Sequence, residues 1–153
     1  MAKKKKPQKS ISNRRARFDY EIKDTLIAGV QLTGAETRAI RQGQADLKGA
    51  YVTAKNGELW LTNVTVSGSH LAPIADEDKT RSRKLLMKSR EIKQFIEAKD
   101  QGNTIVPLEI LNSGKYIKIR IATAVGKKLY DKRATLKERD ASRNIQRYSH
   151  TNN

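Results

Sequence analysis

Cysteine is absent from the 153 residues, and histidine occurs only twice, as His70 and His150. The absence of thiols excludes disulfides, cysteine-based zinc sites and thiol catalysis. Neither histidine stands in a metal-ligand or catalytic spacing, and no glycine-rich phosphate loop is present. The acidic run Asp76-Glu77-Asp78 could hold a divalent cation, but a solvated loop is the commoner meaning of such a run. These absences predict a protein that is not an enzyme and uses no metal or cofactor.

Long apolar runs are also absent. No stretch approaches the roughly 18 consecutive apolar residues of a membrane-spanning helix. Lys3 to Lys6 place positive charge near the start of the chain, but no apolar segment follows them, so the pattern of a secretory signal is missing. We therefore expect a cytoplasmic protein with no membrane partner.

Acidic residues are scarce relative to basic ones. The chain carries 32 Lys and Arg against 16 Asp and Glu, a formal net charge of +16. Residues 1–17, 79–93 and 127–153 contain 23 of the 32 cations. Clustered positive charge is typical of phosphate-binding surfaces, so a nucleic acid is the expected partner; the alternative is that the basic termini are solvated tails. The candidate phosphate contacts in the first two blocks are Arg14, Arg15, Arg17, Arg83 and Lys84.

Six runs rich in β-branched or aromatic residues predict strands. They cover residues 18–22, 30–32, 51–55, 58–64, 104–111 and 117–121. Asn56-Gly57 separates two of these runs and is the strongest short signal for a β-hairpin. Residues 67–82 and 112–114 have the composition of loops and turns. Pro107 cannot donate a backbone hydrogen bond, so its strand should lie at an edge or contain a bulge.

Two segments predict helices. Thr33 and Glu36 have the spacing of a capping box, and the helix that they begin should stop at Gly43. This capping role is sufficient to explain why residue 36 is a glutamate. A second helix is expected over residues 84–99. One face of that helix would carry Leu85, Ile92, Phe95 and Ile96.

Hairpins, not helical crossovers, join most of the predicted strands, so the expected fold class is mainly β. A small closed or nearly closed β-barrel with two or three peripheral helices fits this pattern, because closure removes exposed strand edges. We expect the barrel over residues 13–126. Residues 1–12, which are rich in lysine, predict a disordered basic arm, and residues 127–153 predict a basic tail.

The tail is weakly apolar and repeats Arg139, Arg143 and Arg147 at a spacing of four. Like charges at this spacing disfavour a free helix, but an anionic surface reverses the sign of the effect. The tail is therefore expected to be disordered alone and helical when bound. The alternative is a tail that packs on its own barrel.

Three aromatic residues stand on predicted strands, namely Tyr20, Tyr51 and Trp60. Aromatic side chains on strands stack on bases in proteins that bind single-stranded nucleic acid. Strand aromatics are more often part of the hydrophobic core. The sequence alone leaves both meanings open for these three.

Several motifs follow one another between about residues 13 and 140. They are Asn13-Arg14-Arg15-Ala16-Arg17, Ala28-Gly29-Val30-Gln31-Leu32-Thr33-Gly34-Ala35-Glu36, Ala39-Ile40-Arg41-Gln42-Gly43, Tyr51-Val52, Asn56-Gly57-Glu58, Arg81-Ser82-Arg83-Lys84-Leu85-Leu86, Val106-Pro107-Leu108 and Gly126-Lys127-Lys128-Leu129-Tyr130-Asp131-Lys132-Arg133. In this order and spacing they resemble the small protein B family, the SsrA-binding proteins. The arginine-rich motif at 81–86 and the last motif are the most specific.

The resemblance implies an oligonucleotide-binding-like Greek-key barrel that binds the tRNA-like domain of transfer-messenger RNA. It also implies a monomeric adaptor that enters stalled ribosomes for trans-translation and peptide tagging, with its tail at the small-subunit decoding centre and in the messenger channel. The family's RNA contacts correspond to Asn13, Leu86, Gly126, Lys127 and Lys128. Its decoding-centre contacts correspond to Tyr130, Asp131, Lys132 and Arg133, and the tail arginines 139, 143 and 147 would line the channel.

Two positions depart from the family pattern. The family usually has an acidic residue implicated in RNA binding where Ile27 stands, so no role is assigned to Ile27. It often has histidine where Tyr130 stands, and a tyrosine can still stack on a base.

Two other function classes compete with the adaptor. A structural ribosomal protein would share the barrel and the basic tails. An RNA-modifying enzyme would require catalytic groups, and the sequence does not supply them.

Overall fold

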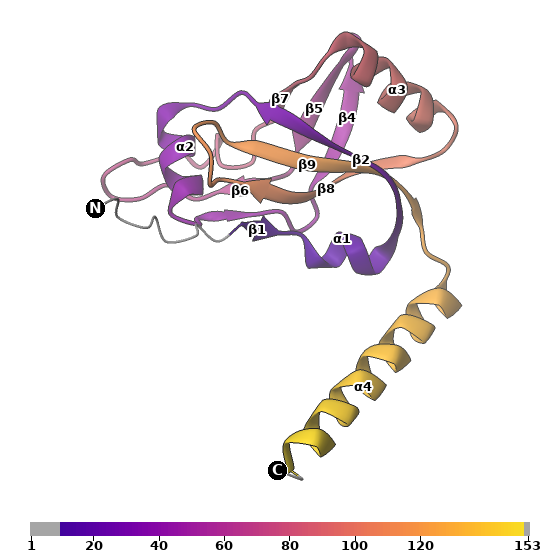
Figure 1. Ribbon diagram of the computed structural model, residues 1–153. Helices are drawn as coiled ribbons and strands as arrows, with labels where there is room; N and C mark the ends of the chain where they lie inside the picture. The colour runs from indigo at the N-terminus through magenta and orange to yellow at the C-terminus, as the bar shows by residue number, and fades with distance from the viewer. Residues whose placement is uncertain (1–9, 152–153) are drawn as a thin grey trace, which may run out of the picture.

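The computed structural model describes residues 10–151, which form nine strands and four helices (Figure 1). In chain order they are β1 (Ile11–Ser12), α1 (Arg14–Asp19), β2 (Tyr20–Val30), α2 (Gly34–Arg41), β3 (Ala45–Asp46), β4 (Tyr51–Lys55), β5 (Glu58–Thr62), β6 (Thr65–Val66), β7 (Arg83–Leu86), α3 (Ser89–Asp100), β8 (Thr104–Leu111), β9 (Lys118–Gly126) and α4 (Leu129–Thr151). Within this described range, no helix has the length and apolar character needed to cross a bilayer.

One antiparallel sheet of seven strands dominates the molecule, in the order β1-β8-β9-β2-β7-β5-β4, and β3 pairs with β6 separately. The mainly β class is confirmed. The predicted closed barrel is not confirmed, because among the described strands β1 and β4 end the sheet without pairing with each other. The sheet nevertheless curls until Cα atoms of β4 lie within 8 Å of Cα atoms of β8.

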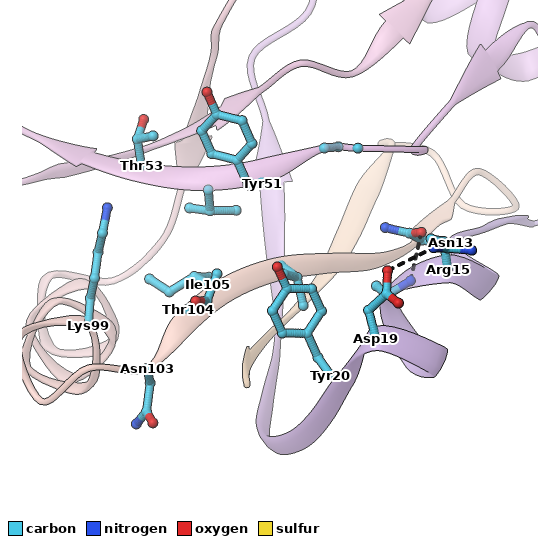
Figure 2. A pocket seen from close by; sticks show the side chains of 15 residues that line it. Asn13, Arg15, Asp19, Tyr20, Tyr51, Thr53, Lys99, Asn103, Thr104 and Ile105 are labelled. Atoms are coloured by element: carbon cyan, nitrogen blue, oxygen red, sulfur yellow. Dashed lines mark hydrogen bonds and ion pairs between the residues drawn. The ribbon is translucent and has the colours of Figure 1, made fainter. Parts of the chain in front are cut away.

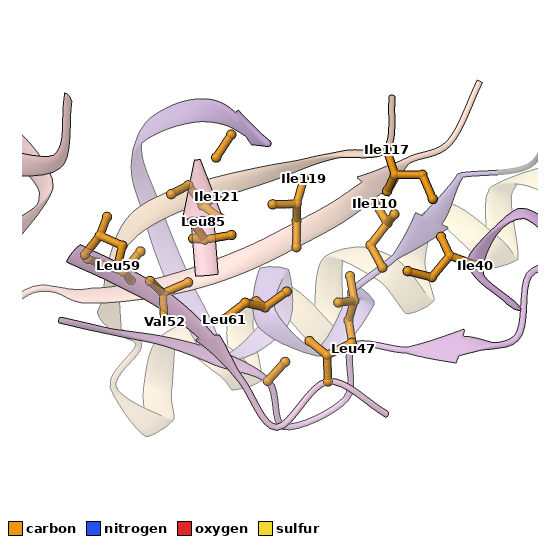
Figure 3. Close-up of a cluster of buried hydrophobic side chains, with 14 of the residues drawn as sticks. Ile40, Leu47, Val52, Leu59, Leu61, Leu85, Ile110, Ile117, Ile119 and Ile121 are labelled. Carbon is orange, nitrogen blue, oxygen red and sulfur yellow. The ribbon is translucent and has the colours of Figure 1, made fainter. Parts of the chain in front are cut away.

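The concave side of the sheet encloses the main hydrophobic core (Figure 3). Leu61, Leu85 and Ile119 are fully buried there, and Ile40 of α2 and Phe95 of α3 extend the core beyond the sheet. A second, smaller cluster lies beneath α1. It contains Ala16, Val106, Leu108, Ala122 and Ala124. Helix α1 therefore packs on the outer surface of β8 and β9.

The N-terminal strand prediction was wrong at its start. Residues 14–19 form α1, because the Asn13 side chain accepts a hydrogen bond from the Ala16 amide and caps the helix. Strand β2 begins at Tyr20 and continues unbroken to Val30, so the run at 30–32 is not a separate strand. Ile11 and Ser12 pair with β8, which moves the start of the sheet ahead of residue 13. Residues 1–9 of the predicted arm lie outside the described residues.

The helix predicted over 84–99 was wrong in its first turn. Residues 83–86 are strand β7, and Leu85 is a core residue of the sheet, not of a helix face. Helix α3 begins at Ser89, where the Glu91 carboxylate accepts from the Lys88 amide.

Other local predictions are confirmed. The capping box at Thr33 and Glu36 begins α2, and the Asn56-Gly57 turn joins β4 to β5. Strand β8 covers 104–111, with a register shift after Pro107 as the proline predicted. The short strands β3 and β6 were missed, as two residues each carry no periodic signal.

The tail forms a single helix, α4, that extends away from the sheet (Figure 1). Within the described residues its main contacts with the body are made with α1. The helical shape is the one expected of the bound tail. That the free tail is disordered stays a prediction.

Candidate nucleic-acid interface

The predicted RNA contacts fall at the two ends of β2. At one end Leu86 of β7 stands directly opposite Gly29. At the other end Gly126 stands opposite Tyr20. Tyr20 and Gly29 are nine positions apart in β2, a distance of about 30 Å along a strand. The structure therefore brings these residues together in two groups and not in one.

The first group centres on an exposed apolar patch. Leu86 is 53% exposed and Ile27 is 48% exposed. Ile27 and Gly29 point to the same face of β2, and Leu86 lies on that face because it pairs with Gly29. A Cβ atom at Gly29 would lie 3.3 Å from the Cβ of Leu86, so the missing side chain keeps this part of the surface flat.

Basic side chains border this patch on the same face. Lys84 lies two residues before Leu86 in β7, Lys118 pairs with Gly29, and Arg120 pairs with Ile27. The Lys84 amine lies 2.7 Å from a carboxylate oxygen of Glu58. A surface with apolar residues at its centre and cations at its border can cover a sugar face while it neutralises phosphates.

Arg120 lies between Ile27 of β2 and an acidic residue of β8. Ile27 lies opposite Arg120 on one side, and Glu109 of β8 lies opposite Arg120 on the other. The Glu109 carboxylate forms the ion pair with Arg120. The neighbouring strand β8 thus supplies the negative charge next to this arginine.

The second group surrounds α1, and Asn13 holds it in place. The Asn13 amide side chain donates to the Pro107 carbonyl at 2.9 Å, and its backbone amide donates to the Leu108 carbonyl at 2.7 Å. Asn13 is buried. Its direct role here is to cap α1 and attach it to β8, so its effect on RNA binding would be exerted by positioning.

Cations of two segments lie around α1. Arg14, Arg15 and Arg17 are exposed on the helix itself. The Lys127 amide donates to the Asp19 carbonyl at 2.8 Å, which places the exposed Gly126 and Lys128 beside the end of α1. The predicted contacts 14–17 and 126–128 therefore form one basic surface.

Helix α4 is joined to α1 by an ion pair and an aromatic contact. The Lys132 amine lies 3.2 Å from the Asp19 carboxylate, and Arg15 approaches the other carboxylate oxygen at 2.9 Å. Partial burial raises the pKa of Asp19, but Lys132 and Arg15 outweigh this effect and hold the pKa below its usual range. The Arg139 guanidinium lies 5.6 Å from the centre of the Phe18 ring. No pattern in the sequence marks Phe18 and Asp19 as residues that contact the tail.

Most tail candidates are exposed along α4. Tyr130 is exposed, as are Arg133, Arg139, Arg143 and Arg147, although the Arg139 guanidinium also contacts Phe18. The side chain of Asp131 lies outside what the structure describes. The exposed side chains give α4 a basic surface.

Arg83 does not belong to the interface. It is 1% exposed, and its guanidinium donates to the backbone carbonyls of Val64 and Asp78. Its Nε lies 3.3 Å from the carboxylate of the buried Glu36. In this conformation Arg83 cannot reach a phosphate, and alternation along β7 gives that role to Lys84 instead.

Glu36 has a second function besides capping α2. Its carboxylate accepts from both Arg81 and the Thr33 amide while it faces Arg83. Burial alone would raise the pKa of Glu36, but the hydrogen bond from Arg81 and the charge of Arg83 outweigh it, so the pKa lies below its usual range. The capping explanation of this glutamate was incomplete, because the pairing links α2 to the loop before β7.

Taken by fold and surface, the molecule is a small β-sheet protein of the nucleic-acid-binding class, with two separated basic surfaces and a basic helical extension. Residues 10–151 match the family model described as SmpB protein. SsrA-binding proteins are similar to this chain: that of Synechococcus sp. (strain JA-2-3B'a(2-13)) is 45% identical over 139 residues, covering 90% of each chain. That of Staphylococcus aureus (strain Newman) is 43% identical over 153 residues, covering 96% of each. The chain belongs to the SmpB protein family.

A solved structure agrees with this placement. It is described as "tmRNA-SmpB: a journey to the center of the bacterial ribosome", and its matching chain is 37% identical with a TM-score of 0.65. The match covers 78% of this chain and 85% of that one. The resemblance seen in the sequence motifs is thereby confirmed.

Proposed function

We propose that this chain is the RNA-binding adaptor of trans-translation: it binds the tRNA-like domain of transfer-messenger RNA and delivers it to stalled ribosomes in the cytoplasm. Membership of the SmpB family carries this proposal, since the relatives are SsrA-binding proteins and the solved relative is described with tmRNA and the ribosome. The two basic surfaces at the ends of β2 supply the physical means.

The two surfaces suit a folded RNA better than an extended strand. They lie about 30 Å apart along β2, so a bound RNA must present phosphates at both places at once. The cations Lys84, Lys118 and Arg120 alternate with apolar residues. Proteins that bind single strands without sequence preference instead stack successive bases on aromatic rings. Recognition of shape through backbone contacts is the expected mode.

The tail would carry the second task. Residues 13–128 hold the RNA in this proposal, and the exposed tail from Tyr130 to Arg147 enters the decoding centre and the messenger channel. The channel wall is phosphate, which favours the exposed arginines of α4. Asp19 and Phe18 would hold the first turns of α4 in a defined direction before the ribosome is reached.

Affinity capture of the full chain from a bacterial lysate, followed by sequencing of the bound RNA, tests the proposal. One dominant small stable RNA supports the adaptor. A broad set of ribosomal RNA fragments that survives high-salt washing would point to a structural ribosomal protein.

Salt dependence tests the electrostatic part of the proposal. If six to ten phosphates are contacted, affinity for the tRNA-like domain should fall by about 10³ to 10⁵ between 50 and 200 mM salt. An affinity that hardly changes over this range would contradict the role given to the cations.

A further inference from the structure

The sheet has a seam where β4 and β8 face each other without pairing. Cα atoms of the two strands lie within 8 Å of each other across it. β1 covers only Glu109 and Ile110 of β8, and Asn13 continues this cover to Pro107 and Leu108. The part of β8 from Thr104 to Val106 is left facing β4.

Backbone polar groups line the floor of the seam. The two-residue turn at Asn56-Gly57 makes Lys55 and Glu58 a hydrogen-bonded pair, so by alternation the N–H and C=O groups of Val52 point away from β5. The Pro107 carbonyl accepts from Asn13 on the side away from β9, so by the same alternation the groups of Ile105 point away from β9 too. Val52 and Ile105 therefore direct these groups into the seam, but the two residues are only 2% and 0% exposed, so the groups lie below the surface and a ligand would contact the side chains above them.

A pocket of about 400 Å³ lies over this floor (Figure 2). Tyr51 of β4 and Tyr20 at the start of β2 both line it. Lys99 and Asn103 stand at one end, where α3 leads into β8, and Arg15 of α1 stands at the other. Tyr51 is 43% exposed, so its ring is not part of the hydrophobic core. The pocket thus combines two tyrosine rings, the polar side chains of Thr53 and Thr104 and a cation at each end, with the Asp19 carboxylate paired to Arg15.

The dimensions exclude an added peptide strand. A strand inserted between β4 and β8 needs about 4.8 Å on each side, and Cα atoms that lie within 8 Å leave less than this. The polar and charged side chains of the lining also disfavour a purely aliphatic ligand. A flat heteroaromatic ring with an attached phosphate fits the pocket, because the ring can stack on tyrosine and the phosphate can reach a cation.

We propose that the seam binds one unpaired nucleotide of the RNA partner. The base lies against Tyr51 and Tyr20, and the flanking phosphates face Lys99 and Arg15. This inference rests on the proposed function, because it assigns the nucleotide to the same folded RNA. It adds a contact to the Leu86 patch and the α1 surface, and this contact is made with a base that is not paired within the RNA.

Three variants of the full chain test the site with the tRNA-like domain of transfer-messenger RNA. Tyr51→Ala removes the exposed stacking face and should weaken binding by about five- to 150-fold, the range expected for loss of one stacked base. Tyr51→Phe keeps the ring and should bind within about twofold of the unchanged protein. Tyr116→Ala removes an exposed tyrosine that does not line this pocket and should bind unchanged.

Chemical probing of the RNA at nucleotide resolution gives the second readout. One unpaired nucleotide should be protected by the unchanged protein and by Tyr51→Phe, and should become reactive with Tyr51→Ala. Equal affinity and equal protection with Tyr51→Ala would overturn the seam site while leaving the adaptor function intact. Failure of the unchanged protein to bind the tRNA-like domain would overturn both.

Discussion

Removal of everything after Lys128 should separate RNA binding from peptide tagging. Neither hydrophobic cluster of the described residues includes a residue beyond Ala124. The truncation removes the partly exposed ion pair of Lys132 with Asp19, worth about 0.2–1 kcal/mol, and the cation–π interaction of Arg139 with Phe18, worth about 0.5–1 kcal/mol. A loss below about 2 kcal/mol shifts the melting temperature by less than about 8 °C in a chain of this size.

The RNA-binding charge survives the same truncation. The removed segment contains six of the 32 cations and three of the 16 acidic residues, so the formal net charge falls only from +16 to +13. The Leu86 patch, the α1 surface and Lys127 remain. Affinity for transfer-messenger RNA in a gel shift should therefore stay within a few-fold of that of the full chain.

Tagging should nevertheless be abolished, because the exposed basic helix is the part proposed to enter the ribosome. The assay is cell-free translation of a message without a stop codon, in which the tagged product is quantified beside the gel shift. Triple alanine substitution of Asp131, Lys132 and Arg133 should reproduce the loss of tagging with RNA binding intact. Normal tagging by the truncated chain, or loss of RNA binding, would refute the division of tasks.

Three further changes have defined outcomes. Glu36→Gln should lower the free energy of unfolding by about 3–5 kcal/mol in urea titration at pH 7, because two arginines lose a buried partner. Since the pKa of Glu36 is lowered on folding, its stabilisation is complete above about pH 4.5 and is lost as the pH falls through the folded-state pKa, so Glu36→Gln should flatten the stability profile in this acidic range. Leu86→Asp should weaken RNA binding at least about tenfold by placing negative charge beside phosphate, whereas Leu71→Asp on an exposed loop should not; equal effects would contradict the patch. Deletion of residues 2–9 should leave the preference for transfer-messenger RNA over bulk tRNA unchanged in competition binding, because the lysines of this segment add only non-specific attraction.

Elements whose cause is local were predictable from the sequence. The capping box at Thr33 and Glu36 and the Asn56-Gly57 turn each depend on residues within a few positions of one another. The bounds of β8 were predicted correctly because a β-branched run ends at a turn signal, and Pro107 correctly predicted the bulge. The family motifs added the candidate surfaces, and the structure placed most of these residues in solvent.

Elements whose cause lies far along the chain were not predictable. The helix-prone run Arg83-Lys84-Leu85-Leu86 is a strand because it pairs with β5 and β2 and because Arg83 meets Glu36, 47 positions away. Phe18 lies in a helix because Asn13 is anchored to Pro107, 94 positions away. A single sequence does not display these pairings, and tertiary contacts of this kind override local propensity.

The narrow joint between α4 and the body makes the tail a lever. Its 23 residues span about 34 Å, so a rotation of about 10° of α1, which holds α4 through Asp19 and Phe18, would displace the far end by about 6 Å. The pivot lies beside Lys127, whose amide is bound to the Asp19 carbonyl within the proposed RNA surface. RNA bound to this surface would therefore move the C-terminal end of α4 without touching it. The angle between α4 and the sheet would then differ between the free and the RNA-bound protein.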